Sequence, residues 1–289
     1  MSEPRAPVAV PPTALVLGAV LSVQVGASLA KGLFEDVGPG GTVFLRVALA
    51  ALLLSAIWRP RVRDRTRREW MLVAAFGVSL AGMNFAFYSA IDLIPLGVAV
   101  TLEFVGPLGV AVALSRRAID LLWVALAGAG ILLLADLGGG GTDPGGMALA
   151  FLAGAFWAAY ILLGVRVGQR FPGGGGLAIA LVLASFCLAP FGVAQGGSEL
   201  LDPRVLGLGL VVAMLASAIP YSLELEALRR LPARVFGVLM SLEPAMAALA
   251  GFVVLAEVLD ARELAGIGFV VAASAGAARA SVAAPPPRD

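Results

Sequence analysis

Histidine is absent from the sequence and cysteine occurs once, as Cys187, which excludes several kinds of site. A protein without histidine has no histidine-ligated metal, no Ser-His-Asp triad and no histidine proton relay. A single cysteine allows neither an intramolecular disulfide nor a thiolate zinc cluster. Metalloenzyme motifs such as HExxH are missing as well. We predict that the protein is not an enzyme and that it has no catalytic residues, no metal site and no cofactor.

Charged residues are also scarce. They make up 13% of the chain, whereas hydrophobic residues make up 60% and the mean hydropathy is +0.96. A soluble domain would carry about 25% charged residues. The composition therefore predicts an integral membrane protein whose surroundings are the lipid bilayer. The net charge of +1 gives no reason to expect nucleic acid as a partner.

The apolar residues are gathered into ten segments that are separated by short loops. A helix that spans a bilayer needs roughly 20 apolar residues, and each segment reaches or approaches that length. The sequence therefore predicts an all-α membrane protein with ten transmembrane helices, at residues 13–33, 40–58, 70–90, 95–114, 121–137, 145–165, 176–194, 205–222, 233–254 and 263–280.

Arginine is concentrated in alternate loops. Six arginines lie between Arg59 and Arg68, and further arginines follow the fourth, sixth and eighth segments. The intervening loops carry mainly Asp and Glu. Because cytoplasmic loops are enriched in Lys and Arg, the arginine loops are predicted to face the cytoplasm. Ten crossings then place both termini there, with cytoplasmic tails at residues 1–12 and 281–289.

A stretch of fourteen residues occurs twice. Residues 94–107, IPLGVAVTLEFVGP, correspond to residues 231–244, LPARVFGVLMSLEP, with two prolines twelve residues apart in both copies and an offset of 137. The string LAGAG at residues 126–130 likewise recurs as LAGIG at residues 264–268. Segments four and five therefore correspond to segments nine and ten, which indicates a repeat unit of five helices.

The duplication predicts two five-helix repeats, at residues 13–137 and 145–280, joined by an extracytoplasmic connector at residues 138–144. An odd number of crossings inverts the second copy relative to the first. The charges agree, since the arginine-rich loop after segment two corresponds to a loop with Glu199 and Asp202 after segment seven. Inverted repeats usually hold a substrate near the bilayer midplane and rock one half against the other, so the architecture indicates a transporter.

Polar side chains within the apolar segments recur at helical spacing and therefore share helix faces. Gln24, Ser28 and Lys31, for example, are separated by four and then three residues. Ligand sites are mostly apolar with a few convergent polar groups, so we expect these faces to line a cavity. The alternative is hydrogen bonding between helices. The predicted substrate-binding residues are Gln24, Ser28, Asn84, Tyr88, Glu103, Trp157, Tyr160, Tyr221 and Glu243.

Glu103 and Glu243 are the carboxylates of the duplicated stretch. A carboxylate in a membrane span is a functional hypothesis by default, and here it would bind a substrate ammonium or exchange a proton. The alternative is a neutral carboxyl group that hydrogen-bonds a backbone carbonyl freed by Pro107 or Pro244. Both prolines are also predicted hinges, because each weakens its helix. The sequence is equally compatible with proton antiport and with facilitated exit.

Two cations lie close to the outer ends of apolar segments. Lys31 is the only lysine, and it is expected either to snorkel to the interface or to pair with Glu103, Glu243 or a substrate carboxylate. Arg46 lies near the start of segment two, where we expect it to snorkel or to cap the helix.

Several strings resemble the EamA-type permeases of the drug/metabolite transporter superfamily. Among them are QVGASLAK at residues 24–31, GVSLAGMNFAFY at residues 77–88, FWAAYIL at residues 156–162 and IPYSLELEAL at residues 219–228. The resemblance extends over nearly the whole chain. It implies an exporter that moves small neutral amino acids of the threonine/homoserine type from the cytoplasm across the inner membrane.

We therefore expect a monomeric, multi-pass exporter that works by alternating access around a central cavity. In this view the aromatic residues form a semi-apolar wall, Gln24 and Asn84 orient the ligand, and Glu103 or Glu243 engages its ammonium group. The alternative on the same fold is an exporter of aromatic amino acids or of hydrophobic drugs and metabolites. An oligomeric channel and an intramembrane enzyme are the other classes, and both are disfavoured.

Overall fold

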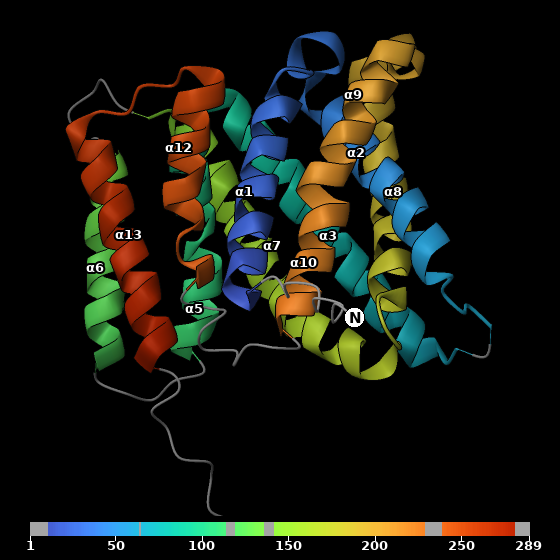
Figure 1. Cartoon of the computed structure of the whole chain (residues 1–289), viewed down its shortest axis with the longest axis horizontal. Coiled ribbons are helices and arrows are strands. Elements are labelled where there is room, and N and C mark those ends of the chain that lie inside the picture. The colour runs from blue at the N-terminus through green and yellow to red at the C-terminus, as the bar shows by residue number, and fades with distance from the viewer. Residues whose placement is uncertain (1–10, 64, 114–118, 136–141, 229–238, 281–289) are drawn as a thin grey trace, which may run out of the picture.

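The computed structural model of the protein describes residues 11–63, 65–113, 119–135, 142–228 and 239–280. All regular elements in these ranges are helices, and most of them run side by side in one bundle (Figure 1). The part before residue 136 contains α1 Pro12–Lys31, α2 Phe34–Trp58, α3 Arg67–Leu93, α4 Leu96–Glu103, α5 Val105–Ala113 and α6 Ile119–Ala135. The part after residue 141 contains α7 Pro144–Arg170, α8 Gly175–Gly196, the 3₁₀ helix η1 Gly197–Leu201, α9 Pro203–Ala213, the π-helix η2 Met214–Ala218, α10 Ile219–Leu228, α12 Glu243–Leu255 and α13 Ala261–Ala280.

These helices coincide with the apolar segments expected from the sequence. Among the described residues, six helices are long and apolar enough to cross a membrane, and three shorter apolar helices accompany them. The fourth expected segment is divided at Phe104 into α4 and α5, and the eighth is formed by α9, η2 and α10 in succession. In the ninth, α12 forms the later part, while residues 233–238 lie outside the described residues. The prediction of an all-α membrane protein is confirmed.

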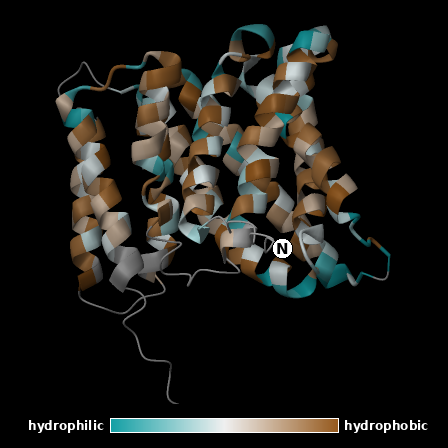
Figure 2. Ribbon diagram, viewed as in Figure 1, coloured by the Kyte–Doolittle hydropathy of each residue, from teal (hydrophilic) through white to brown (hydrophobic). Residues whose placement is uncertain are grey.

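Hydrophobic residues make up most of the length of the helices, and hydrophilic residues are more frequent toward the ends of the bundle (Figure 2). Large apolar side chains face outward from the bundle, for example Leu121 at 72% exposed, Phe186 at 71% and Phe252 at 61%. Soluble proteins rarely expose large contiguous apolar patches. A lipid environment removes this cost, because the bilayer core is as apolar as the side chains themselves.

Two pairs of helices that the predicted duplication relates pack against each other, α2 with α8 and α6 with α13 (Figure 1). Helix α4 also packs against α12, and these two helices belong to the corresponding segments four and nine. Small residues bring their backbones close together. A Cβ atom on Gly97 would lie 2.7 Å from the Cα atom of Ala248, and one on Gly130 would lie 2.7 Å from the carbonyl oxygen of Gly266. The early and late parts of the chain therefore meet through direct backbone contact, which larger side chains would prevent.

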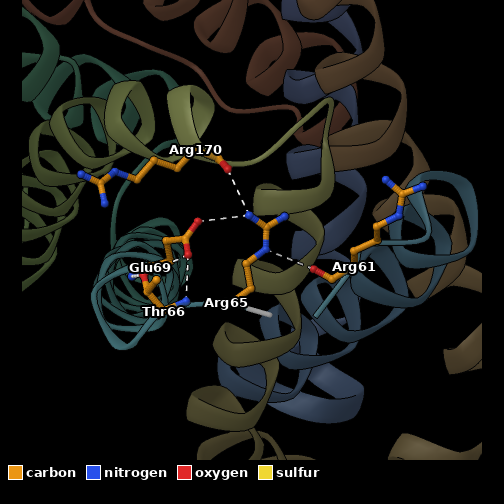
Figure 3. Close-up of polar contacts among 5 residues, drawn as sticks. All are labelled: Arg61, Arg65, Thr66, Glu69 and Arg170. Carbon is orange, nitrogen blue, oxygen red and sulfur yellow. Dashed lines mark hydrogen bonds and ion pairs between the residues drawn. The ribbon is translucent and has the colours of Figure 1, made fainter. Parts of the chain in front are cut away.

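Arg61 and Arg65, in the loop between α2 and α3, lie near Arg170 at the end of α7 (Figure 3). Arg65 Nη1 donates to Glu69 Oε1 at 3.1 Å and to the carbonyl oxygen of Arg170 at 3.2 Å, and its guanidinium lies 4.6 Å from the ring centroid of Phe171. Thr66 and Glu69 form a capping box that starts α3. Two of the arginine loops that the sequence assigns to the same side of the membrane are thus in direct contact.

Candidate functional site

A cavity of about 420 Å³ lies between helices of the early and late parts of the chain. Its wall is built from α1, α2, α3, α4, α5, α7, η2, α10, α12 and α13. This volume falls within the range of small-molecule sites, which run from about 300 to 1,000 Å³. The cavity is therefore large enough to enclose a metabolite such as an amino acid.

Most of the predicted substrate-binding residues belong to this wall, namely Gln24, Asn84, Glu103, Trp157, Tyr160, Tyr221 and Glu243. Two of the aromatic rings are held by other rings. Trp157 meets Phe104 edge to face with centroids 5.4 Å apart, and Tyr160 stacks on Phe76 at 4.8 Å. Packed aromatic pairs of this kind fix the shape of the wall. The sequence thus identified much of the cavity lining from helical spacing and polarity alone.

Ser28 and Tyr88 are buried, but they are not part of the wall. Ser28 Oγ donates to the carbonyl oxygen of Gln24 at 2.9 Å, so the hydroxyl is satisfied within its own helix. The Tyr88 hydroxyl accepts a hydrogen bond from Arg46 at 3.3 Å. The prediction that these two residues line the cavity is therefore wrong, because protein groups occupy their hydroxyls.

Arg46 is in the wall, and the expectation that it snorkels or caps a helix is wrong. Helix α2 is assigned from Phe34, but its backbone leaves helical geometry at Gly38, where a φ of 67° and a ψ of 169° produce a kink that glycine accommodates. The helix that carries Arg46 therefore begins just after this kink, close to the predicted start at Gly40. Arg46 is only 8% exposed. Its side chain is thus buried in the wall of the cavity although it lies near the start of its helix.

The guanidinium group of Arg46 donates four hydrogen bonds, and all four acceptors are neutral oxygens. Nε donates to Ser217 Oγ at 3.2 Å, Nη1 donates to Asn84 Oδ1 at 2.7 Å and to the Tyr88 hydroxyl, and Nη2 donates to the carbonyl oxygen of Ala216 at 2.8 Å. Asn84 is itself fixed, since its Nδ2 donates to the carbonyl oxygen of Leu80 at 2.8 Å. The cation is thus fastened to α3 and to η2.

One of these acceptors, the carbonyl oxygen of Ala216, is available because a proline follows it four residues later in the sequence. In an α-helix the carbonyl oxygen of Ala216 would accept from the N–H of residue 220, but that residue is Pro220 and has no N–H. The chain forms the π-helix η2 just before the proline, with the N–H of Ile219 bonded to the carbonyl of Met214. Such π-bulges occur often at functional sites. The carbonyl oxygen that Pro220 leaves without a partner is the one that Arg46 uses.

Three carboxyl groups line the same cavity, those of Glu103, Glu224 and Glu243. Glu103 is the last residue of α4 and Glu243 is the first residue of α12, so both stand where a helix is interrupted. Among the described residues, none of the three is within ion-pair distance of a cation.

Two polar atoms of the wall are buried without a hydrogen-bond partner, Gln24 Oε1 and Ser274 Oγ. Buried polar atoms are almost always paired, so each exception asks for an explanation. Both atoms are able to accept a hydrogen bond. The cavity therefore combines a fixed cation, three carboxyl groups and two unpaired polar atoms, which suits a small solute with charges of both signs.

Lys31 lies away from this cavity, and the expected pairing with Glu103 or Glu243 is wrong. Its Nζ donates to Glu257 Oε1 at 2.6 Å, and Glu257 Oε2 accepts from the backbone N–H of Leu96 at 2.9 Å. Glu257 follows Ala256, which ends α12 with a positive φ of 54° and turns the chain back toward α4. Lys31 thus ties the end of α1 to the start of α4 and to the end of α12.

Known proteins share both the sequence and the fold of this chain. The model of the EamA-like transporter family matches residues 144–279. The threonine/homoserine exporter RhtA of Escherichia coli (strain K12) is 46% identical over 267 residues, which are 92% of this chain and 90% of that protein. The RhtA of Salmonella typhimurium (strain SL1344) is 45% identical over the same share. The chain belongs to the EamA-like transporter family.

A more distant member is the uncharacterized transporter YwfM of Bacillus subtilis (strain 168), 28% identical over 240 residues, or 80% of each chain. A solved crystal structure with 20% identity aligns over 94% of this chain and 97% of its own, with a TM-score of 0.61, which shows a shared fold. The resemblance noted in the sequence is confirmed. The chain is a multi-pass membrane transporter of the EamA-like family and not an enzyme.

Arg46, Glu224 and Ser274 belong to the cavity wall but were not among the site residues predicted from the sequence. A signal for Arg46 was available, because an arginine inside an apolar run is costly and suggests a functional role, just as a carboxylate there does. A second signal was Pro220, because a proline has no N–H and so cannot bond the carbonyl oxygen four residues earlier in its helix. Ser274 gives no comparable signal, since a serine in a membrane helix commonly bonds to its own backbone.

We expect the link between Lys31 and Glu257 to contribute a modest stabilisation. The two side chains are 24% and 15% exposed, so screening by solvent limits the ion pair to about 1 kcal/mol or less. Lys31→Met and Glu257→Gln should each lower the unfolding temperature in detergent, and the double variant should lose less than the sum. Glu199→Gln, on an exposed turn, is the control. Additive losses would show that the pair is not coupled.

Proposed function

We propose that this protein exports small neutral amino acids of the threonine/homoserine type across the bacterial inner membrane. The observation that carries the proposal is the cavity, whose wall holds the Arg46 guanidinium together with three carboxyl groups. An amino-acid zwitterion presents one carboxylate and one ammonium group, so it complements a wall with both signs of charge. The names of the relatives at 46% and 45% identity support this substrate class.

Within the cavity, Glu103 or Glu243 engages the ammonium group of the solute, and the rings of Trp157, Tyr160 and Tyr221 enclose its side chain. The unpaired Gln24 Oε1 supplies an acceptor for the ammonium group or for a side-chain hydroxyl. Hydroxyl-bearing solutes gain most from such an acceptor, because a buried site built to hydrogen-bond a hydroxyl discriminates strongly against analogues that lack it.

The transport cycle we propose is alternating access by two inverted five-helix repeats, residues 13–137 and 145–280, with both termini in the cytoplasm. The pairing of α2 with α8 and of α6 with α13 supports the repeat, since elements related by a two-fold axis can meet on that axis. The arginine loops support the orientation. Pro107 and Pro244 serve as hinges, which is supported by the helix break at Phe104 and by the start of α12 at Glu243.

The test is a counterflow screen with the purified protein in liposomes. Vesicles loaded in turn with homoserine or with each of the twenty amino acids should accumulate labelled threonine from outside only when the loaded amino acid is a substrate. We expect threonine, homoserine and similar small neutral amino acids to drive uptake, and protein-free vesicles to show none. Preference for aromatic amino acids would instead favour the alternative exporter, and flux that does not saturate would indicate a channel.

A further inference from the structure

We infer that the guanidinium group of Arg46 is the receptor for the carboxylate of the transported solute. This inference rests on the proposed function, because it assigns one half of the zwitterion to a particular side chain. The first support is the cost of the arrangement. Arg46 is 8% exposed, and a buried charge without a counter-ion is among the most expensive features a protein can hold.

The second support is how the protein holds this cation without neutralising it. Its four acceptors among the described residues are two hydroxyls, one amide oxygen and one backbone carbonyl, so none carries a formal charge. Within the described part of the chain, no carboxylate lies within 4.0 Å of the guanidinium. The protein thus orients the group through hydrogen bonds and leaves its positive charge available to the cavity.

The third support is the remaining hydrogen-bonding capacity of the group. A guanidinium has five N–H donors, and the described residues accept from four of them. The remaining donor is on Nη2. The longest of the four bonds is the 3.3 Å contact of Nη1 with the Tyr88 hydroxyl, which is the one most readily exchanged for a stronger acceptor. One N–H from Nη2 and one from Nη1 suit the bidentate geometry that guanidinium and carboxylate groups prefer.

The fourth support is the distribution of opposite charge around the cavity. Arg46 projects from α2, whereas Glu103, Glu224 and Glu243 belong to α4, α10 and α12. A zwitterion with its carboxylate on Arg46 turns its ammonium group toward one of these carboxyl groups. Arg46 then selects amino acids over amines and other cations, which the carboxyl groups alone would also attract.

The competing explanation is a structural role, in which Arg46 only joins α2 to α3 and to η2. The two explanations differ in what they predict for solute recognition. A structural arginine affects folding and stability, but it does not distinguish a solute that has a carboxylate from one that lacks it. Recognition of the carboxylate is therefore the quantity to measure.

The first measurement uses the unmodified protein in liposomes. Threoninol keeps the ammonium group and side chain of threonine but has a neutral hydroxymethyl group in place of the carboxylate, and threonine amide has a neutral amide there. If Arg46 receives the carboxylate, both analogues should compete with labelled threonine about 100-fold more weakly than threonine itself. Competition by threoninol at the strength of threonine would overturn the inference.

The second measurement compares variants. Arg46→Gln should raise the KM for threonine about 100-fold and should reduce the preference for threonine over threoninol to within about threefold. Arg46→Lys keeps the charge without the fork of donors and should retain a part of that preference. Arg204→Gln, on the exposed start of α9, is the matched control and should behave like the unmodified protein. An Arg46→Gln variant that folds, transports and keeps the full preference would overturn the inference.

These outcomes separate the inference from the function on which it rests. If no amino acid supports counterflow, the proposed function fails and this inference fails with it. If threonine is transported and threoninol competes equally well, the function stands and only the role of Arg46 is refuted. Should Arg46→Gln not fold, the analogue competition in the unmodified protein and in Arg46→Lys still decides the question.

Discussion

Of the three substitutions Glu103→Gln, Glu224→Gln and Glu243→Gln, we expect one to raise the KM for the exported amino acid roughly 10- to 100-fold, and the other two to leave it within about threefold. Glutamine preserves the shape of the side chain and removes its charge. A hydrogen bond to a charged partner contributes about 1.5–3 kcal/mol, which corresponds to that change in affinity.

The expectation of a single large effect follows from charge balance. With a zwitterion bound, the cavity contains the positive charge of Arg46, a solute of zero net charge and three carboxyl groups. It is neutral when one of the three carboxyl groups is ionised. Two further negative charges in the same low-dielectric space would repel each other and the first. One carboxylate is therefore expected to meet the ammonium group while the other two are neutral.

The measurement is the concentration dependence of threonine counterflow for each variant, with Glu199→Gln on the exposed 3₁₀ helix η1 as the control. Equal, large losses in all three variants would show that the carboxyl groups act together rather than singly. Unchanged transport in all three would refute any role for them in holding the ammonium group. Glu103 and Glu243 also stand at different offsets from their prolines, so equivalence between these two is not expected.

Replacing Gly106 by alanine is expected to prevent correct assembly of the bundle. A Cβ atom on this residue of α5 would lie 2.0 Å from the carbonyl oxygen of Gly154 and 2.6 Å from its carbonyl carbon. Both are backbone atoms of α7, which no side-chain rotation moves away. Overpacking costs about 1–3 kcal/mol even where side chains yield, so a fixed backbone contact is expected to cost at least the upper part of that range.

Gly109 provides a control on the same helix, because, outside its own stretch of helix, no atom of the described residues lies within 4 Å of the position that a Cβ atom would occupy there. Gly109→Ala should be neutral or slightly stabilising, since alanine is favoured over glycine in a helix by about 1 kcal/mol. The yield of monodisperse protein in detergent and its unfolding temperature distinguish the two variants. Equal behaviour would mean that α5 and α7 do not meet at Gly154.

The membrane class, the positions of the helices and several polar and aromatic residues of the cavity lining were predictable from the sequence. Apolar runs of spanning length define helices without reference to packing, and polar residues repeated at helical spacing point to a shared face. Gln24, Asn84 and Tyr160 were found in this way. The two glutamates were found because a carboxylate in an apolar run is costly.

The errors have a common physical cause, which is that sequence spacing does not determine the partner of a polar group. Ser28 shares a face with Gln24, but its hydroxyl donates a hydrogen bond to the backbone of its own helix. Lys31 pairs with Glu257, a residue 226 positions away that no local pattern connects to it. Arg46 was misplaced because its position near the start of an apolar segment suggested an interfacial residue, whereas its side chain is buried and donates hydrogen bonds to α3 and η2.

Pro220 influences the cavity without being part of its wall. Because Pro220 has no N–H, the carbonyl oxygen of Ala216 can accept a hydrogen bond from Arg46. The position of the charge in the binding site therefore depends on a proline outside it. Among relatives, a change at this position would alter solute selectivity even if every residue in contact with the solute stayed the same. Efforts to redirect this transporter to other substrates should therefore include the helix backbone behind the cavity as a site of variation.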